Sequence, residues 1–250
     1  MHRLFLADAA KGGADLEIAG REAHHALHVL RVKGGDAVTV LDGRGGEYDC
    51  EVREAGRHSL RVAVKKKRSS DRAPYQVTLF QALPKGKAFE TILQKATELG
   101  AYRIVPLLTD RVVTRGEKHE KWQWVMIDAM KQCGNPWMPL LEPPQKFGDA
   151  LKRVKEFDLG LVGSLHEGRR NPREWFEQLG GNVLAYPSKV AVWVGPEGDF
   201  TAAEMDALLN AGVKPMSLGR LVLRSDTAAV AALAIINHEL DFACIAIKKS

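Results

Sequence analysis

From residue 76 onward the chain alternates short apolar runs with amphipathic segments, and this alternation limits the fold more than any other feature of the sequence. Residues 76–83 form such a run. Residues 87–100 follow with apolar side chains at helical spacing, and Gly100 ends the pattern. Runs this apolar are normally buried on both faces of a parallel sheet covered by helices. Further runs lie at 103–108, 158–163, 189–194 and 213–219. We therefore predict an α/β domain built on a parallel sheet.

The beginning of the chain follows a different pattern, that of short strands joined by turns. Residues 36–52 place the glycine-rich turn 43–46 between two stretches of alternating apolar and polar residues, which indicates a hairpin. Residues 59–67 indicate a further strand, and residues 22–36 a short helical or irregular piece. Several short strands with turns between them predict a small β-barrel.

A basic segment at residues 65–75 separates the two patterns. It contains a run of lysine and arginine, two serines and a proline, which is typical of a linker. We therefore expect two domains, residues 1–70 and residues 71–250. The basic run has two interpretations, a solvated strand end or a phosphate-contacting patch beside a hinge.

The composition excludes several classes of protein. The formal net charge of +5 is a moderate basic bias, which permits a nucleic acid partner without requiring one. Cys50, Cys133 and Cys244 are far apart and form no CxxC motif, so we expect neither a disulfide framework nor a metal site. The longest apolar run, near residues 228–236, is too short to span a bilayer. We expect a soluble cytoplasmic protein without a metal or a membrane partner.

The segment VGPEGDF places a carboxylate, Glu197, in a Gly-Pro turn directly after an apolar strand. Thr201 and Glu204 have the spacing of a capping box, so a helix follows the turn. The turn therefore lies at the carboxyl end of a strand, where α/β sheets bind their ligands.

The turn is poorly suited to a phosphate. Pro196 removes one backbone donor, and Glu197 and Asp199 would repel an anion. Carboxylates accept hydrogen bonds from amines and hydroxyls, and S-adenosylmethionine carries such groups together with a sulfonium. The alternative is a tight loop with a solvated acid.

Two further loops follow strands in the same way, at residues 164–168 and 217–227. The second leads into an almost wholly apolar helix, which we expect to be buried against the sheet or another subunit. Ser225, Asp226 and Thr227 are all competent helix N-caps. Arg224 precedes them, where the helix dipole disfavours a cation unless an acid or a developing negative charge offsets the cost.

Four segments together resemble the bacterial small-subunit (16S) rRNA uridine N3-methyltransferase family. They are HHALHVLRVKGGDAVTVLDGRGGEYDCEV, QALPKGKAFETILQKATELGAYRIVPLLTDRVV, GPEGDF and LGRLVLRSDTA. The resemblance spans nearly the whole chain. It implies a PUA-like β-barrel over residues 1–70 and a SPOUT-class α/β domain with a C-terminal trefoil knot over residues 71–250. It also implies a homodimer that acts on 16S rRNA in the small ribosomal subunit.

The resemblance also implies the site residues. S-adenosylmethionine would lie in the knot loops, against Leu165, His166, Gly195, Pro196, Glu197, Gly198, Ser217, Leu218, Gly219, Leu223, Ser225, Asp226 and Thr227. Candidate RNA-contacting cations are Arg31, Lys33, Lys65, Lys66, Lys67 and Arg68. The chain departs from the family at four positions: the family usually has Gly where Asp199 stands, Thr-Glu where Ser225 and Asp226 stand, and often Arg where Asn135 stands.

The chemistry that the resemblance implies needs a stabilised anion. N3 of uracil carries a proton, and its removal spreads negative charge onto the ring carbonyls. Arg224 is the candidate catalytic residue that would stabilise this charge. No general base is evident, and the reaction needs no metal. Two alternatives stay open: a related methyltransferase that acts on a ribose hydroxyl or on tRNA, and a non-catalytic RNA-binding protein.

Overall fold

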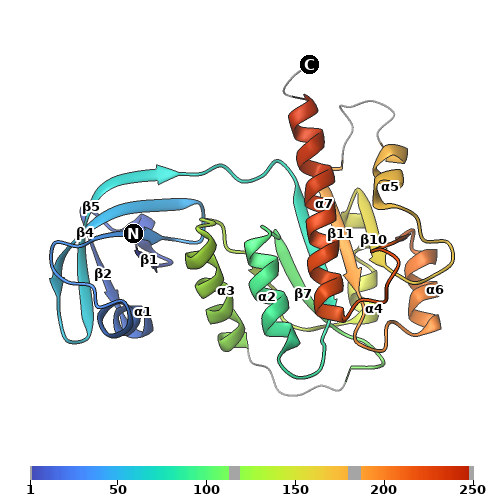
Figure 1. Ribbon diagram of the computed structural model, residues 1–250, viewed down its shortest axis with the longest axis horizontal. Coiled ribbons are helices and arrows are strands. Elements are labelled where there is room, and N and C mark those ends of the chain that lie inside the picture. The colour runs from blue at the N-terminus through green and yellow to red at the C-terminus, as the bar shows by residue number, and fades with distance from the viewer. Residues whose placement is uncertain (1, 113–118, 180–186, 248–250) are drawn as a thin grey trace. The chain divides into compact units, whose positions relative to one another are not determined.

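The chain divides into two units, each of which is described by itself (Figure 1). The first contains Met1–Arg72 and Ile127–Met138, and the second contains Ala73–Met126 and Pro139–Ser250. The computed structural model describes residues 2–112, 119–179 and 187–247. The domain boundary after residue 70 stays a prediction.

A five-stranded sheet forms the first unit. The strands lie in the order β1-β3-β4-β5-β2, with β1 parallel to β3 and the other pairs antiparallel. The bounds are β1 (His2–Phe5), β2 (Asp15–Ala19), β3 (Ala37–Leu41), β4 (Gly46–Ala55) and β5 (Ser59–Ser69). Alternate side chains, among them Leu4, Ile18, Val40 and Leu60, form its hydrophobic core. The hairpin expected at 36–52 is β3 followed by β4, so that prediction is confirmed.

Three short helical pieces accompany this sheet. They are η1 (Ala9–Lys11), α1 (Gly20–His24) and the π-helical turn η2 (His25–Val29).

The prediction that a linker begins at residue 65 is wrong, because β5 pairs with β4 as far as Ser69. Residues 65–68 therefore lie in a strand.

A buried ion pair fixes the end of α3 (His119–Cys133) within the first unit. Lys131 Nζ lies 2.7 Å from Glu22 Oε1, and both side chains are buried. Arg3 donates hydrogen bonds to the carbonyl oxygens of Lys131 and Gln132, at 3.0 and 3.1 Å. These bonds satisfy carbonyls that the last helical turn leaves open. The contacts explain why Ile127–Met138, far along the chain, belongs to the first unit.

A seven-stranded parallel sheet forms the second unit. Its order is β12-β10-β11-β6-β7-β8, and β9 also pairs with β7. The strands are β6 (Gln76–Ala82), β7 (Arg103–Leu108), β8 (Leu140–Leu141), β9 (Gln145–Lys146), β10 (Leu159–Gly163), β11 (Lys189–Val194) and β12 (Lys214–Met216). The predicted parallel sheet is confirmed.

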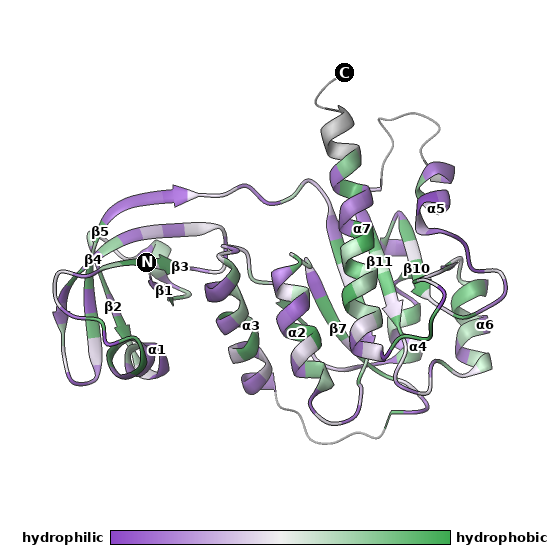
Figure 2. Cartoon of the chain, viewed as in Figure 1, coloured by the Kyte–Doolittle hydropathy of each residue, from purple (hydrophilic) through white to green (hydrophobic). Residues whose placement is uncertain are grey.

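Helices cover both faces of this sheet. They are α2 (Ala88–Glu98), α4 (Phe147–Leu151), η3 (Val154–Glu156), α5 (Pro172–Leu179), α6 (Ala202–Asn210) and α7 (Ser225–Ile247). On one face α7 packs against α2, β6 and β11 (Figure 1). On the other face α4 contacts α6 and β7. Figure 2 shows hydrophobic residues concentrated in the strands and along α7, as the apolar sequence of that helix requires. The trefoil knot stays a prediction.

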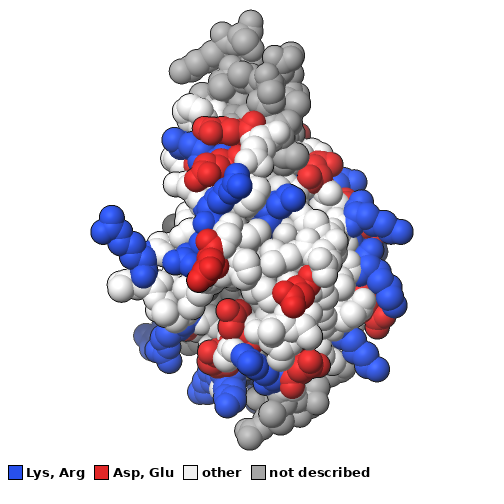
Figure 3. Space-filling model, turned by 90° about the vertical axis from the view of Figure 1, so that its right-hand side faces the viewer, with Lys and Arg blue, Asp and Glu red and all other residues white. Residues whose placement is uncertain are grey.

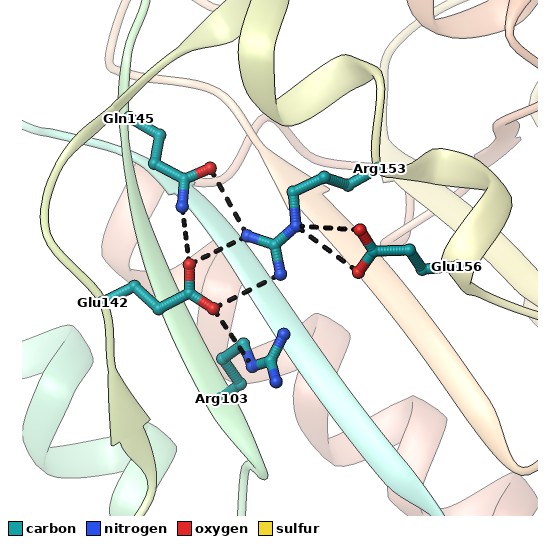
Figure 4. Close-up of polar contacts among 5 residues, drawn as sticks. All are labelled: Arg103, Glu142, Gln145, Arg153 and Glu156. Atoms are coloured by element: carbon teal, nitrogen blue, oxygen red, sulfur yellow. Dashed lines mark hydrogen bonds and ion pairs between the residues drawn. The ribbon is translucent and has the colours of Figure 1, made fainter.

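Aromatic rings and a polar network stabilise the α4 face. The rings of Phe80 and Trp193 stack with their centroids 4.2 Å apart. The Arg153 guanidinium lies over the Phe80 ring at 5.5 Å and forms an ion pair of 2.8 Å with Glu142. Glu142 also forms an ion pair of 3.2 Å with Arg103 of β7, and Figure 4 shows how these side chains converge. We interpret the network as structural, because it joins β7, η3 and the segment before β9.

Candidate functional site

Three loops converge on one cavity at the carboxyl ends of the parallel strands. The loop after β10, the loop after β11 and the segment between β12 and α7 enclose an open space of about 610 Å³. Adjacent parallel strands present their carboxyl ends at the same sheet edge, so these loops meet. The cavity is lined by Gly163, Ser164, Leu165, Val194, Gly195, Pro196, Glu197, Asp199, Leu218, Gly219, Leu221, Val222, Leu223, Ser225 and Ala228.

Most of the residues expected at a cofactor site are among those lining the cavity. Eight are Leu165, Gly195, Pro196, Glu197, Leu218, Gly219, Leu223 and Ser225. Five others, His166, Gly198, Ser217, Asp226 and Thr227, belong to the same loops but do not line this space. Arg224 does not line it either, although both of its neighbours do.

The turn after β11 is held closed by its own atoms. Asp199 donates its backbone N–H to the carbonyl of Pro196 at 2.9 Å, and its carboxylate accepts the N–H of Phe200 at 2.8 Å. Asp199 has a φ of 60°, a left-handed conformation that favours Gly and tolerates Asp. This conformation explains why an aspartate can stand at a position where the resemblance implies glycine.

Gly195 leaves room for other atoms of this turn. A Cβ atom at Gly195 would lie 2.7 Å from Asp199 Oδ1 and 3.1 Å from the backbone nitrogen of Phe200. Gly198 is less constrained, because a Cβ there would meet the flexible side chain of Arg111 at 3.3 Å. The two glycines of the turn therefore differ in their tolerance of a side chain.

Glu197 joins the turn to a fourth segment. Its Oε1 accepts the backbone N–H of Lys85 at 2.8 Å, in the loop that follows β6. The side chain is exposed. A carboxylate can accept several hydrogen bonds, so one such bond leaves capacity for a ligand.

The exit of the turn is fixed by the capping box that the sequence predicts. Thr201 Oγ1 accepts the N–H of Glu204 at 3.2 Å, and Glu204 Oε2 accepts the N–H of Thr201 at 2.9 Å. Glu204 Oε1 also accepts the N–H of Asp110 at 3.0 Å. The capping box is confirmed, and it orients the start of α6.

The loop after β10 is ordered by local hydrogen bonds. Ser164 Oγ accepts the N–H of His166 at 2.9 Å, and His166 Nδ1 accepts the N–H of Gly168 at 3.1 Å. Arg169 donates to the carbonyl of Leu165 at 2.7 Å. His166 thus shapes the loop, and Leu165 provides its surface toward the cavity.

The hydroxyl of Ser225 joins two walls of the cavity. It is buried at the start of α7 and donates to the carbonyl oxygen of Gly195 at 2.6 Å. It also accepts a hydrogen bond of 3.0 Å from Nε2 of Gln81 in β6. Gln81 begins one of the segments that carry the resemblance but was not among the predicted site residues. The signal that could have found it is a polar residue near the end of an otherwise apolar strand.

Arg224 is exposed directly before α7. Its carbonyl accepts the N–H of Ala228 at 2.8 Å, which begins the helical ladder. Within the described residues, its guanidinium makes no hydrogen bond or ion pair. The acidic partner that could offset the helix dipole is therefore absent from the part of the chain that the structure describes. Asp226 accepts the N–H of Thr227 at 2.8 Å, so these two residues act at the helix start.

The segment before α7 also exposes apolar side chains. Leu221 and Val222 are each 77% exposed although both line the cavity, and Leu165 across it is 50% exposed. Large exposed apolar groups gathered in one place are typical of surfaces that bind something.

Two of the four basic residues at 65–68 form ion pairs with acids of β4. Lys65 Nζ lies 3.0 Å from Glu51, and this hydrogen bond lowers the pKa of the Glu51 carboxyl. Arg68 lies 2.8 Å from Asp49. Lys67 lies over the ring of Tyr48 at 5.6 Å, and Lys66 is exposed.

Arg31 and Lys33 differ from these residues, because neither side chain has an ion pair in the described part of the chain. Both are exposed, and Arg31 has a φ of 55°. A left-handed non-glycine residue is uncommon and often lies at a functional position. All six candidate cations lie in the first unit.

Neither a metal centre nor a membrane span is present in the described ranges. No three His, Cys, Asp or Glu side chains of those ranges could hold a metal ion together. No helix there has both the length and the apolar character needed to cross a bilayer. Figure 3 shows the side of the molecule at the right of Figure 1, where basic side chains are interspersed with acidic ones.

Comparison with known proteins places these features in a family. Residues 71–237 match the model of an RNA methyltransferase domain, and residues 18–65 match that of an RNA methyltransferase PUA domain. The chain is 32% identical to ribosomal RNA small subunit methyltransferase E of Synechocystis over 242 residues, which cover 96% of this chain and 78% of the relative.

Two solved structures support the same family assignment. A putative methyltransferase from Legionella pneumophila, in complex with the cofactor SAM, is 28% identical with a TM-score of 0.84, over 94% of this chain and 96% of that one. Ribosomal RNA small subunit methyltransferase E from Neisseria gonorrhoeae, bound to S-adenosyl methionine, is 26% identical with a TM-score of 0.83. The match covers 95% of this chain and 97% of that one. The expected fold class is confirmed. The chain belongs to the RNA methyltransferase family that includes ribosomal RNA small subunit methyltransferase E.

Proposed function

We propose that this protein transfers a methyl group from S-adenosylmethionine to N3 of a uridine in the 16S rRNA of the small ribosomal subunit. One observation carries the proposal: the three loops that the resemblance assigns to the cofactor enclose a single cavity. The names of the relatives support the small-subunit substrate, and the solved relatives with bound cofactor support the methyl donor.

The residues around the cavity fit S-adenosylmethionine. The leucines and valines of the lining suit an adenine ring and an alkyl chain. Glu197 and Asp199 suit the positive charges of the sulfonium and the amino group. When bound, the cofactor supplies an electrophilic methyl group. We assign to this site all thirteen residues that the resemblance implies for the cofactor. Those that line the cavity form its surface, and the others shape the loops.

Arg224 is the proposed catalytic residue. It is exposed beside the cavity wall formed by Leu223 and Ser225, and no acid of the described chain neutralises it. A guanidinium can donate in a fork to a uracil carbonyl and stabilise the anion that remains when N3 loses its proton. An acidic partner would have weakened that effect.

We also propose a homodimer and a location in the cytoplasm. The exposed Leu221 and Val222 would be covered by a second copy of the chain, and a measurement of mass in solution tests this. The cytoplasm follows from the proposed ribosomal substrate. We further propose that the first unit binds RNA, because residues 18–65 match an RNA methyltransferase PUA domain.

The function is tested by incubating the purified protein with labelled S-adenosylmethionine and small ribosomal subunits from a strain that lacks the gene. We expect label in the 16S rRNA, and 3-methyluridine in its nucleoside digest. A ribose-methylated nucleoside would favour the alternative methyltransferase, and an unlabelled rRNA together with normal RNA binding would favour a non-catalytic protein.

Arg224→Gln should lower single-turnover methyl transfer in this assay by about two to three orders of magnitude. Loss of one donor to a developing anion raises a barrier by about 2.7–4 kcal/mol. Cofactor affinity, measured in parallel by calorimetry, should change little because Arg224 does not line the cavity. Near-normal transfer would remove Arg224 from the chemistry, and parallel loss of cofactor binding would make it a cofactor residue.

Gly195→Ala should weaken S-adenosylmethionine binding about tenfold or more. The added Cβ would collide with Asp199 and force the turn open, and overpacking of this kind costs about 1–3 kcal/mol. Gly148→Ala is the control, because Gly148 lies outside the site and an added Cβ there would meet nothing within 4 Å. Its affinity should stay within about threefold of the native value. Equal affinities of the two variants by calorimetry would show that the turn does not shape the site.

Arg31→Gln combined with Lys33→Gln should weaken RNA binding and reduce the slope of log affinity against log salt by about 1.4–1.8. These two side chains have no acidic partner in the described residues, so phosphate groups of the RNA can bind them. Lys65→Gln is the matched control, since its charge is already paired with Glu51, and it should change the slope less. An unchanged slope in the double variant would place the RNA contacts elsewhere.

A further inference from the structure

Gln81 is a fully buried polar side chain beside the cavity, and the cofactor role of the loops does not account for it. It lies near the carboxyl end of β6, where it pairs in register with Val194 of β11. Gly195, the first residue of the turn, follows Val194 directly. Buried amides are costly unless their groups are hydrogen-bonded, so their presence needs an explanation.

The amide nitrogen of Gln81 donates two hydrogen bonds. Gln81 Nε2 donates to the hydroxyl oxygen of Ser225 at 3.0 Å and to the carbonyl oxygen of Ala82 at 2.8 Å. Because the Ser225 oxygen accepts from Gln81, its single proton is left for the carbonyl of Gly195, to which it donates at 2.6 Å. Gln81 therefore sets the direction of a bond that joins the turn to the start of α7.

The acceptor group of the same amide has no partner. Gln81 Oε1 is buried and makes no hydrogen bond with any residue that the structure describes. An unsatisfied buried acceptor destabilises the native state. An apolar side chain of similar shape would avoid that cost, so fold stability alone does not explain a glutamine here.

We propose that Gln81 is a positioning residue for methyl transfer. Its amide fixes Ser225, and Ser225 holds the first turn of α7, with Arg224 directly before it, against the turn that contains Gly195. The same bonds explain the departure from the family at this position: serine supplies the hydroxyl that threonine would supply. This inference rests on the proposed function, because it assigns Arg224 a place beside the methyl acceptor.

The arrangement predicts which step depends on Gln81. The cavity surface comes mainly from apolar side chains and backbone that Gln81 does not contact, so cofactor affinity should depend on it weakly. The position of Arg224 relative to the acceptor should depend on it strongly, since small displacements of a catalytic group cost large factors in rate.

The test compares Gln81→Met, which keeps the length and unbranched shape of the side chain, with the native protein. We expect single-turnover transfer to fall by about tenfold or more, with cofactor affinity within about threefold of the native value and an unchanged melting temperature. Amide hydrogen exchange of residues 195–199 and 225–228 should become faster, a readout that needs no acceptor and separates failure of this inference from failure of the proposed function. Thr78→Val, a buried change in the same strand, is the matched control and should alter neither measurement.

Ser225 variants give a second route if Gln81→Met does not fold. Ser225→Ala removes the hydroxyl and should lose about as much transfer as Gln81→Met. The double variant Gln81→Met with Ser225→Ala should lose no more than either alone, because both changes break one chain of bonds. Native transfer in Gln81→Met or Ser225→Ala, additive losses in the double variant, or unchanged exchange of the two segments would overturn the proposal.

Discussion

The site depends on the buried hydroxyl of Ser225, because this one group contacts both the turn after β11 and the central strand β6. Parallel strands bring loops to one edge of a sheet but do not fix how the loops meet. Ser225 donates to Gly195 and accepts from Gln81, so the start of α7 has a single position relative to the turn. Asp199 closes the turn, and Glu197 attaches it to the loop after β6. These bonds join the segments that meet at the cavity.

Much of this fold could be predicted from the sequence, because its signals are local. Apolar runs identified β6, β7, β10 and β11, and helical spacing identified α2 after β6. The capping box of α6 could be read from two residues, Thr201 and Glu204. The three loops of the site were found for the same reason, since each follows a strand at its carboxyl end.

The rest depended on contacts between distant residues, which no local pattern encodes. The ion pairs of Lys65 and Arg68 could not be predicted, because their acidic partners lie on the neighbouring strand β4. The membership of Ile127–Met138 in the first unit depends on the pairing of Lys131 with Glu22, more than a hundred residues earlier. Gln81 was missed because its partner Ser225 is 144 residues away along the chain. The close approach of Asp199 to Gly195 could not be predicted either, because it depends on how the turn folds back on itself.

Amide hydrogen exchange with and without S-adenosylmethionine shows whether the three loops hold this cofactor. We expect protection concentrated in residues 163–166, 194–199 and 217–228, with no protection in residues 2–72. This measurement needs neither RNA nor turnover, so it locates the site independently of the methyl acceptor. Binding without protection of these loops, or protection confined to other parts of the chain, would contradict the account.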